Sequence, residues 1–222
     1  MERINGGSFA GLTKRKIEHF FINFYIIGLA GIIIPYTRDF FIMLTPLTLL
    51  LCFSALLAFH KSKLNIKTIL VFFIIGITGF FIEVAGVKTG EVFGNYVYGN
   101  TLGIKVFETP LMIGINWAML VYISASLVST LSVTPLIRIV IASLLMLIYD
   151  VILEQIAPLL DMWHWLGSEI PVRNYISWFI ISLLFHTLFY FTGIEKSTIA
   201  RVIYVCQISF FVILIIFFRF IA

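Results

Sequence analysis

Charged residues are scarce in this chain, and that scarcity excludes an ordinary soluble domain. Only 12% of the 222 residues are Asp, Glu, Lys or Arg, against about 25% in typical soluble domains, and 61% are hydrophobic. Cysteine is scarce too. Cys52 and Cys206 both fall inside apolar runs, where they indicate small apolar side chains rather than a disulfide framework.

The chain also lacks the residue patterns of most cofactor and metal enzymes. Its four histidines, His19, His60, His164 and His186, are scattered, so the clustered ligands of a membrane di-iron oxygenase are absent. No G-x-G-x-x-G follows a strand, so no dinucleotide-binding module is visible. No paired Asp-rich motif indicates prenyl diphosphate chemistry, and the last apolar run has no lysine for a retinal Schiff base. We expect neither a cofactor nor a metal.

Long apolar runs are what the chain has instead. A transmembrane helix needs about 20 apolar residues. Seven segments qualify: 17–34, 40–60, 67–87, 110–131, 136–160, 175–193 and 199–220. We predict an all-α integral membrane protein, a single polytopic domain over residues 1–222, built as one bundle of about seven transmembrane helices. A polar loop rich in Gly and Tyr joins its third and fourth spans.

Basic residues at the ends of these segments predict an orientation. The first segment follows three cations but is too long for a signal peptide, so we expect a retained span. With a cytoplasmic N-terminus, ten Lys and Arg residues fall inside and five outside, which favours a multi-pass protein of the cell membrane with its C-terminus outside. The net charge of +4 therefore gives no indication of nucleic acid binding. The inner ten are Arg3, Lys14, Arg15, Lys16, Lys61, Lys63, Lys67, Arg138, Lys196 and Arg201, and the outer five are Arg38, Lys88, Lys105, Arg173 and Arg219.

Two polar blocks interrupt the apolar pattern. The first runs from Glu83 to Trp117 and is rich in glycine and tyrosine, and the second runs from Asp150 to Trp178. Polar groups at membrane depth are costly, so they usually mark a functional site. In the predicted topology both blocks lie on the outer side, and we expect them to meet.

The carboxyl residues of these blocks are candidate catalytic groups. Asp150 and Glu154 are four residues apart, which places them on one face of a helix. Two carboxyls so close to lipid should not both ionise freely, so we expect one to stay protonated near neutral pH. A neutral acid beside an apolar pocket is what general acid catalysis requires. The alternative is a pair of solvated carboxylates at a helix end.

Other polar and aromatic residues in or near these blocks can be interpreted as purely structural as well as functional. Tyr96 and Tyr98 would serve equally in an interfacial aromatic belt, and Trp163 and Trp165 as anchors in an outer loop. His186, in the middle of the sixth span, is more typical of a hydrogen bond between helices than of catalysis.

The two blocks together resemble the CruF family of membrane carotenoid hydratases, which includes carotenoid 1,2-hydratases and bisanhydrobacterioruberin hydratases. The resemblance covers about residues 67–193, with Gln155 and Ser177 as departures from the family pattern. The residues that carry it are Glu83, Gly86, Gly90, Phe93, Gly94, Tyr96, Tyr98, Leu102, Gly103, Pro110, Asn116, Trp117, Asp150, Glu154, Trp163, Trp165, Pro171, Asn174 and Trp178.

The resemblance implies that water is added to the terminal double bond of an acyclic carotenoid end, giving a tertiary alcohol. We expect Asp150 to be the acid, with Glu83 as the alternative, and Glu154 or Glu83 to orient water. The expected substrate-binding residues are Tyr96, Tyr98, Asn116, Trp117, Trp163, Trp165, Asn174 and Trp178.

The expected partners are the carotenoid, water, the lipid bilayer and, as candidates, other carotenoid enzymes. A basic, non-halophilic composition favours a C40 substrate such as lycopene or γ-carotene over the C50 bisanhydrobacterioruberin type. Two other readings stay open at this point. One is an isoprenoid enzyme like a membrane lycopene cyclase, and the other is a lipid transporter without catalysis.

Overall fold

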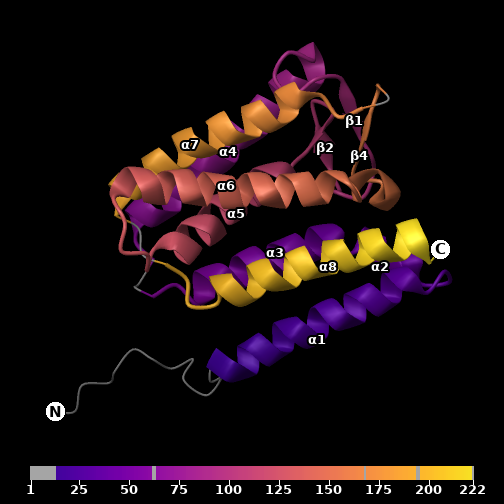
Figure 1. The fold of residues 1–222 in the computed structure, drawn as a ribbon, viewed down its shortest axis with the longest axis horizontal. Coiled ribbons are helices and arrows are strands. Elements are labelled where there is room, and N and C mark those ends of the chain that lie inside the picture. Colours follow the sequence, from indigo (N-terminus) through magenta and orange to yellow (C-terminus); the bar gives the residue numbers. More distant parts are fainter. Residues whose placement is uncertain (1–13, 62–63, 168, 194–195, 222) are drawn as a thin grey trace.

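The computed structural model describes residues 14–61, 64–167, 169–193 and 196–221. These residues form eight α-helices, one 3₁₀ helix and four short strands (Figure 1). The helices are α1 (Lys14–Ile33), α2 (Arg38–Met43), α3 (Thr45–Ala58), α4 (Ile66–Thr89), α5 (Met112–Val128), α6 (Pro135–Glu154), α7 (Val172–Thr192), α8 (Ala200–Phe220) and the 3₁₀ helix η1 (Ala157–Leu160). The strands are β1 (Tyr96–Tyr98), β2 (Lys105–Val106), β3 (Thr109–Pro110) and β4 (Trp163–Trp165).

Five helices of the described ranges are long and apolar enough to cross a membrane: α1, α4, α6, α7 and α8. Two further apolar helices are shorter, with 14 residues in α3 and 17 in α5. The prediction of a helical membrane protein is therefore confirmed, whereas the count of seven full-length spans is not.

Proline accounts for two differences from the predicted spans. The segment expected at 40–60 is divided, because α2 ends before Leu44 and Pro46 lies in the first turn of α3. Proline has no N–H to donate and fits the first turn of a helix but not its interior. The segment expected at 136–160 ends as an α-helix at Glu154, and Pro158 lies in the 3₁₀ turn that follows.

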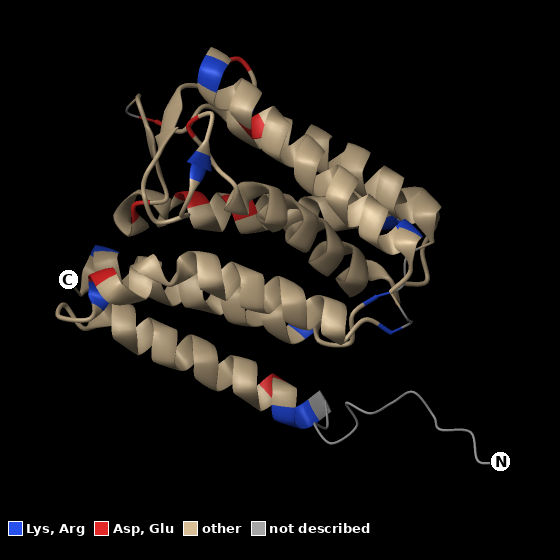
Figure 2. Cartoon of the chain, turned by 180° about the vertical axis from the view of Figure 1, so that it is seen from behind, with Lys and Arg blue, Asp and Glu red and all other residues tan. Residues whose placement is uncertain are grey.

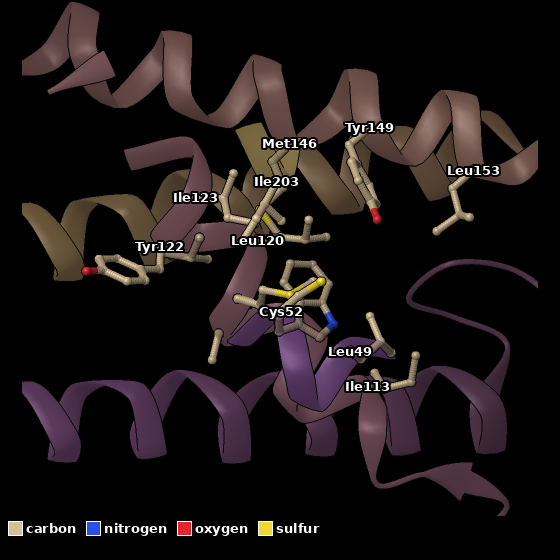
Figure 3. Packing of buried hydrophobic residues seen from close by; sticks show 14 of the residues in the cluster. Leu49, Cys52, Ile113, Leu120, Tyr122, Ile123, Met146, Tyr149, Leu153 and Ile203 are labelled. Atoms are coloured by element: carbon tan, nitrogen blue, oxygen red, sulfur yellow. The ribbon is translucent and has the colours of Figure 1, made fainter. Parts of the chain in front are cut away.

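The helices form two groups that run roughly along one direction. In Figure 1, α1, α3 and α8 lie on one side and α4, α6 and α7 on the other, and α5 contacts helices of both groups. Buried apolar side chains fill the space between the groups. Cys52, Leu120, Met146 and Ile203 bring together α3, α5, α6 and α8 (Figure 3).

The strands lie at one end of the bundle and join the two polar blocks. β1 pairs with β4 in antiparallel fashion, with Tyr96 opposite Trp165 and Tyr98 opposite Trp163. The predicted meeting of the two blocks is therefore confirmed. Figure 2 shows most of the acidic residues at this same end and long uncharged stretches between the two ends. The orientation in the membrane stays a prediction, and residues 1–13 lie outside the described part.

Candidate active site

Glu83 lies in the last two turns of α4, where the chain folds back onto it. Gly90 ends α4 in the left-handed conformation (φ 68°), which glycine adopts without a steric cost. Alternate residues of a strand point to the same side, so Tyr96 and Tyr98 of β1 both face the helix. Their hydroxyls donate to Glu83 Oε2, over 2.6 Å from Tyr96 and 2.8 Å from Tyr98. This geometry replaces the reading of both tyrosines as belt aromatics.

Trp117 of α5 supplies the third donor to Glu83. Its indole Nε1 lies 3.0 Å from Glu83 Oε1, and its ring stacks on Trp178 with the centroids 4.2 Å apart. Gly79, one turn before Glu83, makes room for this indole. A Cβ at Gly79 would come within 2.7–2.8 Å of Trp117 atoms.

Glu154, the last residue of α6, has a matching set of donors. The indole N–H groups of Trp163 and Trp165 lie 3.1 and 2.7 Å from Glu154 Oε2. The amide nitrogen of Asn174 lies 3.2 Å from Glu154 Oε1. The strand β4 thus holds this carboxyl much as β1 holds Glu83.

Asp150 is different from both glutamates. Its side chain is fully buried, and its Oδ2 accepts one hydrogen bond of 3.2 Å from Asn174, the amide that also donates to Glu154. Its Oδ1 has no hydrogen-bond partner in the described part of the chain. One amide therefore bridges the two carboxyls of α6.

The three buried carboxyls differ in how many hydrogen bonds they accept, and this difference favours a proton on one of them. All three are at most 4% exposed, and no ion pair with Lys or Arg is found for them within the described residues. Donated hydrogen bonds favour the ionised form of a carboxyl, and desolvation opposes it. Glu83 and Glu154 each accept three donors and Asp150 only one. The arrangement therefore fits Asp150 as the carboxyl that holds a proton.

The tyrosine hydroxyls that donate to Glu83 stay protonated. Burial first, and then the negative charge of Glu83, raise the pKa of Tyr96 and Tyr98 above the ordinary value. Both phenols therefore keep the proton that they donate.

A small cavity of about 20 Å³ lies between the glutamates. That volume matches a single water molecule, which needs roughly 10–15 Å³ and several polar partners. Glu83, Glu154 and Asn174 offer such partners from the wall. The remaining wall is mostly aromatic and consists of Phe93, Tyr96, Tyr98, Ile113, Trp117, Trp163, Trp165 and Trp178.

A larger, largely apolar cavity of about 160 Å³ lies next to the small one. Ile113 and Trp163 line both cavities and form the wall between them. The larger cavity extends among α1, α3, α5, α6 and α8. A hydrocarbon chain in it would end beside the water-sized pocket.

The predicted site residues thus fall into three places. Nine of the eleven line the small cavity, Asn116 lines the larger one, and Asp150 reaches the small cavity only through Asn174. Ile113 was missed because an apolar residue at the start of a span carries no signal of its own. Phe93 was noted only as part of the family pattern. Within the described residues, no group of three or more His, Cys, Asp or Glu is arranged to hold a metal ion.

His186 belongs to a separate cluster away from these carboxyls. Its Nε2 lies 2.7 Å from Ser124 Oγ of α5, and its Nδ1 lies 2.7 Å from the Ser182 carbonyl and 3.2 Å from Ser143 Oγ of α6. The reading of His186 as a hydrogen-bonding residue between helices is confirmed.

Comparison with known proteins gives a family match. A family model described as "Carotenoid biosynthesis protein" matches residues 43–222, which include both polar blocks and every predicted site residue. No curated protein and no solved structure matched the chain significantly. The match agrees with the resemblance found in the sequence.

Proposed function

The chain belongs to the carotenoid biosynthesis protein family, and we propose that it adds water across the terminal double bond of an acyclic carotenoid end group. The product is a tertiary alcohol. One observation carries the proposal: a water-sized pocket with two carboxyls in its wall adjoins an apolar cavity suited to a hydrocarbon chain. A reaction between water and an alkene needs both compartments side by side.

The first step is protonation of the alkene. Asp150 lies behind Asn174 and lines neither cavity, so in this step the Asn174 amide moves aside and the alkene end reaches the acid. Asp150 then gives its proton to the less substituted carbon of a trisubstituted double bond, and the π electrons form the new C–H bond. A tertiary carbocation remains on the neighbouring carbon. The unpartnered Oδ1 of Asp150 supports this role, because no acceptor within the described residues competes for a proton held there.

The second step is attack by water on the cation. The oxygen lone pair forms the C–O bond, and the surplus proton leaves to a carboxylate. Glu83, held by three donors, orients the water, and the ring faces of Trp117 and Trp178 stabilise the nearby positive charge. Burial of these rings in a low-dielectric site strengthens that attraction.

The third step restores the catalyst. Glu154 takes the proton from the attacking water and returns it to Asp150, one helical turn away. Asn174 supports this route because its amide donates to both carboxyls, at 3.2 Å each. Protons and electrons balance over the cycle, with one water consumed for each alcohol formed.

The substrate that fits the composition is a C40 carotenoid with an acyclic end, such as lycopene or γ-carotene. Cyclisation of the same end group would also begin with protonation of the alkene. It consumes no water, so it would not require the water-sized pocket between the two glutamates. Hydration is therefore the favoured outcome of the protonated intermediate.

Pigment analysis tests this function. The chain would be expressed in a bacterium that accumulates lycopene or γ-carotene, with the Asp150→Asn variant as the matched control. We expect a pigment one water heavier with the wild type and none with the variant at equal protein level. A pigment of unchanged mass but altered retention would point to cyclisation, and unaltered pigment would contradict the proposal for C40 substrates.

A further inference from the structure

A third cavity, of about 250 Å³, lies at the strand end of the bundle (Figure 1). It is formed by the end of α6, the 3₁₀ helix η1, β4 and the loop that leads to α7. Pro158, His164 and Glu169 in its wall are exposed residues, so the cavity opens at the surface of the protein. We call this cavity the vestibule.

The vestibule shares a wall with the water-sized cavity. Glu154 and Trp165 line both of them. The indole Nε1 of Trp165 donates to Glu154 Oε2 over 2.7 Å, and the Trp165 ring packs against Tyr96 with the centroids 5.3 Å apart. The shared wall therefore consists of two side chains joined by one hydrogen bond.

The two tryptophans of β4 face different compartments. Both donate to Glu154 Oε2, and as alternate residues of a strand they lie on the same side of it. Trp163 lines the small cavity and the larger apolar one, whereas Trp165 lines the small cavity and the vestibule. The vestibule also has His164 and Glu169 in its wall. The small cavity thus adjoins an apolar compartment and a polar one, through different side chains.

The proposed reaction creates a need for such a polar compartment. Each turnover consumes one water molecule, and the small cavity has the volume for one, so this water must be replaced in every cycle. The hydrocarbon core of a bilayer holds no water to supply it. The larger cavity is mainly apolar, whereas the vestibule has room for several water molecules and polar side chains to bind them.

We propose that the vestibule supplies the reacting water, which passes between Trp165 and Glu154 into the small cavity. The inference rests on the proposed function, because only a reaction that consumes water needs this supply. Trp165 is the moving part. Its indole swings away from Glu154 to admit water, and the restored hydrogen bond closes the wall before the alkene is protonated. A closed wall excludes bulk water, so electrostatic interactions in the small cavity stay strong.

Hydrogen exchange at the indole N–H groups tests this route without requiring turnover. The chain has four tryptophans, and all four line the small cavity. The full chain, with nitrogen-15 in its tryptophans, would be transferred in lipid nanodiscs to deuterated water, and the decay of each indole NMR signal followed. Water from the vestibule reaches Trp165 first, so we expect its N–H to exchange about tenfold faster than that of Trp117, which does not line the vestibule.

A bulky charged label in the vestibule should slow this exchange. Ile170→Cys places a thiol in the vestibule wall, where a membrane-impermeant methanethiosulfonate reagent would attach the label. We expect exchange at Trp165 to slow by about tenfold, and hydration of an acyclic carotenoid to slow in parallel. Leu166→Cys is the matched control, because Leu166 is 67% exposed in the same loop and is not part of the vestibule wall. Labelled Leu166→Cys, and wild type treated with the reagent to control for Cys52 and Cys206, should keep both rates.

The exchange and hydration measurements separate this proposal from the proposed reaction. Exchange at Trp165 no faster than at Trp117, or unchanged by the label at Ile170→Cys, would overturn the water route. Hydration at the full rate in that labelled protein would overturn it too. If the label slows exchange but no form of the protein makes a hydrated product, the vestibule stands as a water entrance and the proposed reaction fails. If hydrated product forms and the label leaves exchange unchanged, the reaction stands and this route fails.

Discussion

The bundle holds two buried polar clusters. They differ in how many acidic groups they contain and in how well hydrogen bonds satisfy their polar atoms. The histidine cluster around His186 combines this histidine with the serines Ser124, Ser143 and Ser182, and both ring nitrogens have partners. It leaves only one hydroxyl, that of Ser182, without a partner among the described residues. The carboxyl cluster of Glu83, Asp150 and Glu154 gathers three acids, and none of them forms an ion pair with a Lys or Arg in the described part of the chain.

This difference separates a structural use of polar residues from a chemical one. Hydrogen bonds between α5, α6 and α7 account for His186 by packing alone. Packing does not account for three carboxyls buried among four tryptophans beside a water-sized pocket. A buried polar residue therefore indicates catalysis when its neighbours do not neutralise its charge, and a structural role when hydrogen bonds between helices satisfy it. The following variants test that distinction.

The largest effect is expected from Asp150→Asn. The change keeps the shape of the side chain and removes its acidic proton, so the hydration rate should fall by about 10²- to 10⁴-fold. Product formation per folded protein in membranes measures it, with melting temperature as the check on folding. Full activity in this variant would remove Asp150 from the mechanism.

Glu154→Gln should interrupt the return of the proton rather than its first transfer. We expect about one product molecule per protein in a rapid phase, followed by turnover slowed on the order of 10²-fold. Rapid quenching of purified protein with excess polyene would resolve the two phases. Steady turnover at the wild-type rate would show that the water proton leaves by another route, with Glu83 as the next carboxyl to test.

Gly79→Ala should have a smaller effect through position alone. The added methyl would meet the Trp117 indole and move its N–H away from Glu83, which we expect to lower the hydration rate by about tenfold. Gly167→Ala is the control, since the nearest atom to a Cβ there is 3.9 Å away. Equal activity of the two variants would mean that the place of Trp117 is not critical.

The smallest effect on chemistry is expected in the histidine cluster. His186→Ala should lower the free energy of unfolding by about 1–3 kcal/mol, because it removes the hydrogen bonds that join the ring to Ser124 of α5 and Ser143 of α6. Activity per folded molecule should stay at the wild-type level. A loss of activity as deep as that of Asp150→Asn would end the distinction between the two clusters.

The sequence predicted the parts of this site that depend on periodicity. Asp150 and Glu154 share a face because they are four residues apart, and both contact Asn174. Spacing alone did not reveal that Tyr96 and Tyr98 face Glu83, since this requires the turn at Gly90 and the pairing of β1 with β4.

Other features required the tertiary structure. Asn116 and Trp117 are adjacent in sequence but point about 100° apart on α5, so they line different cavities. The second predicted span is divided at Pro46, and this division could not be predicted from apolar composition alone. Gln207 is a polar residue in an apolar run, but only the fold places it in the wall of the larger cavity.

The most direct test of the central claim is isotope incorporation during turnover by the purified protein in lipid nanodiscs. The reaction would be run with an acyclic carotenoid in water labelled with both oxygen-18 and deuterium, and the product analysed by mass spectrometry after exchange of its hydroxyl proton. The account predicts one oxygen-18 atom and one carbon-bound deuterium in each new alcohol, because solvent supplies both the nucleophile and the proton of the acid. An oxygen that comes from dissolved oxygen gas, or an alcohol without carbon-bound deuterium, would contradict it.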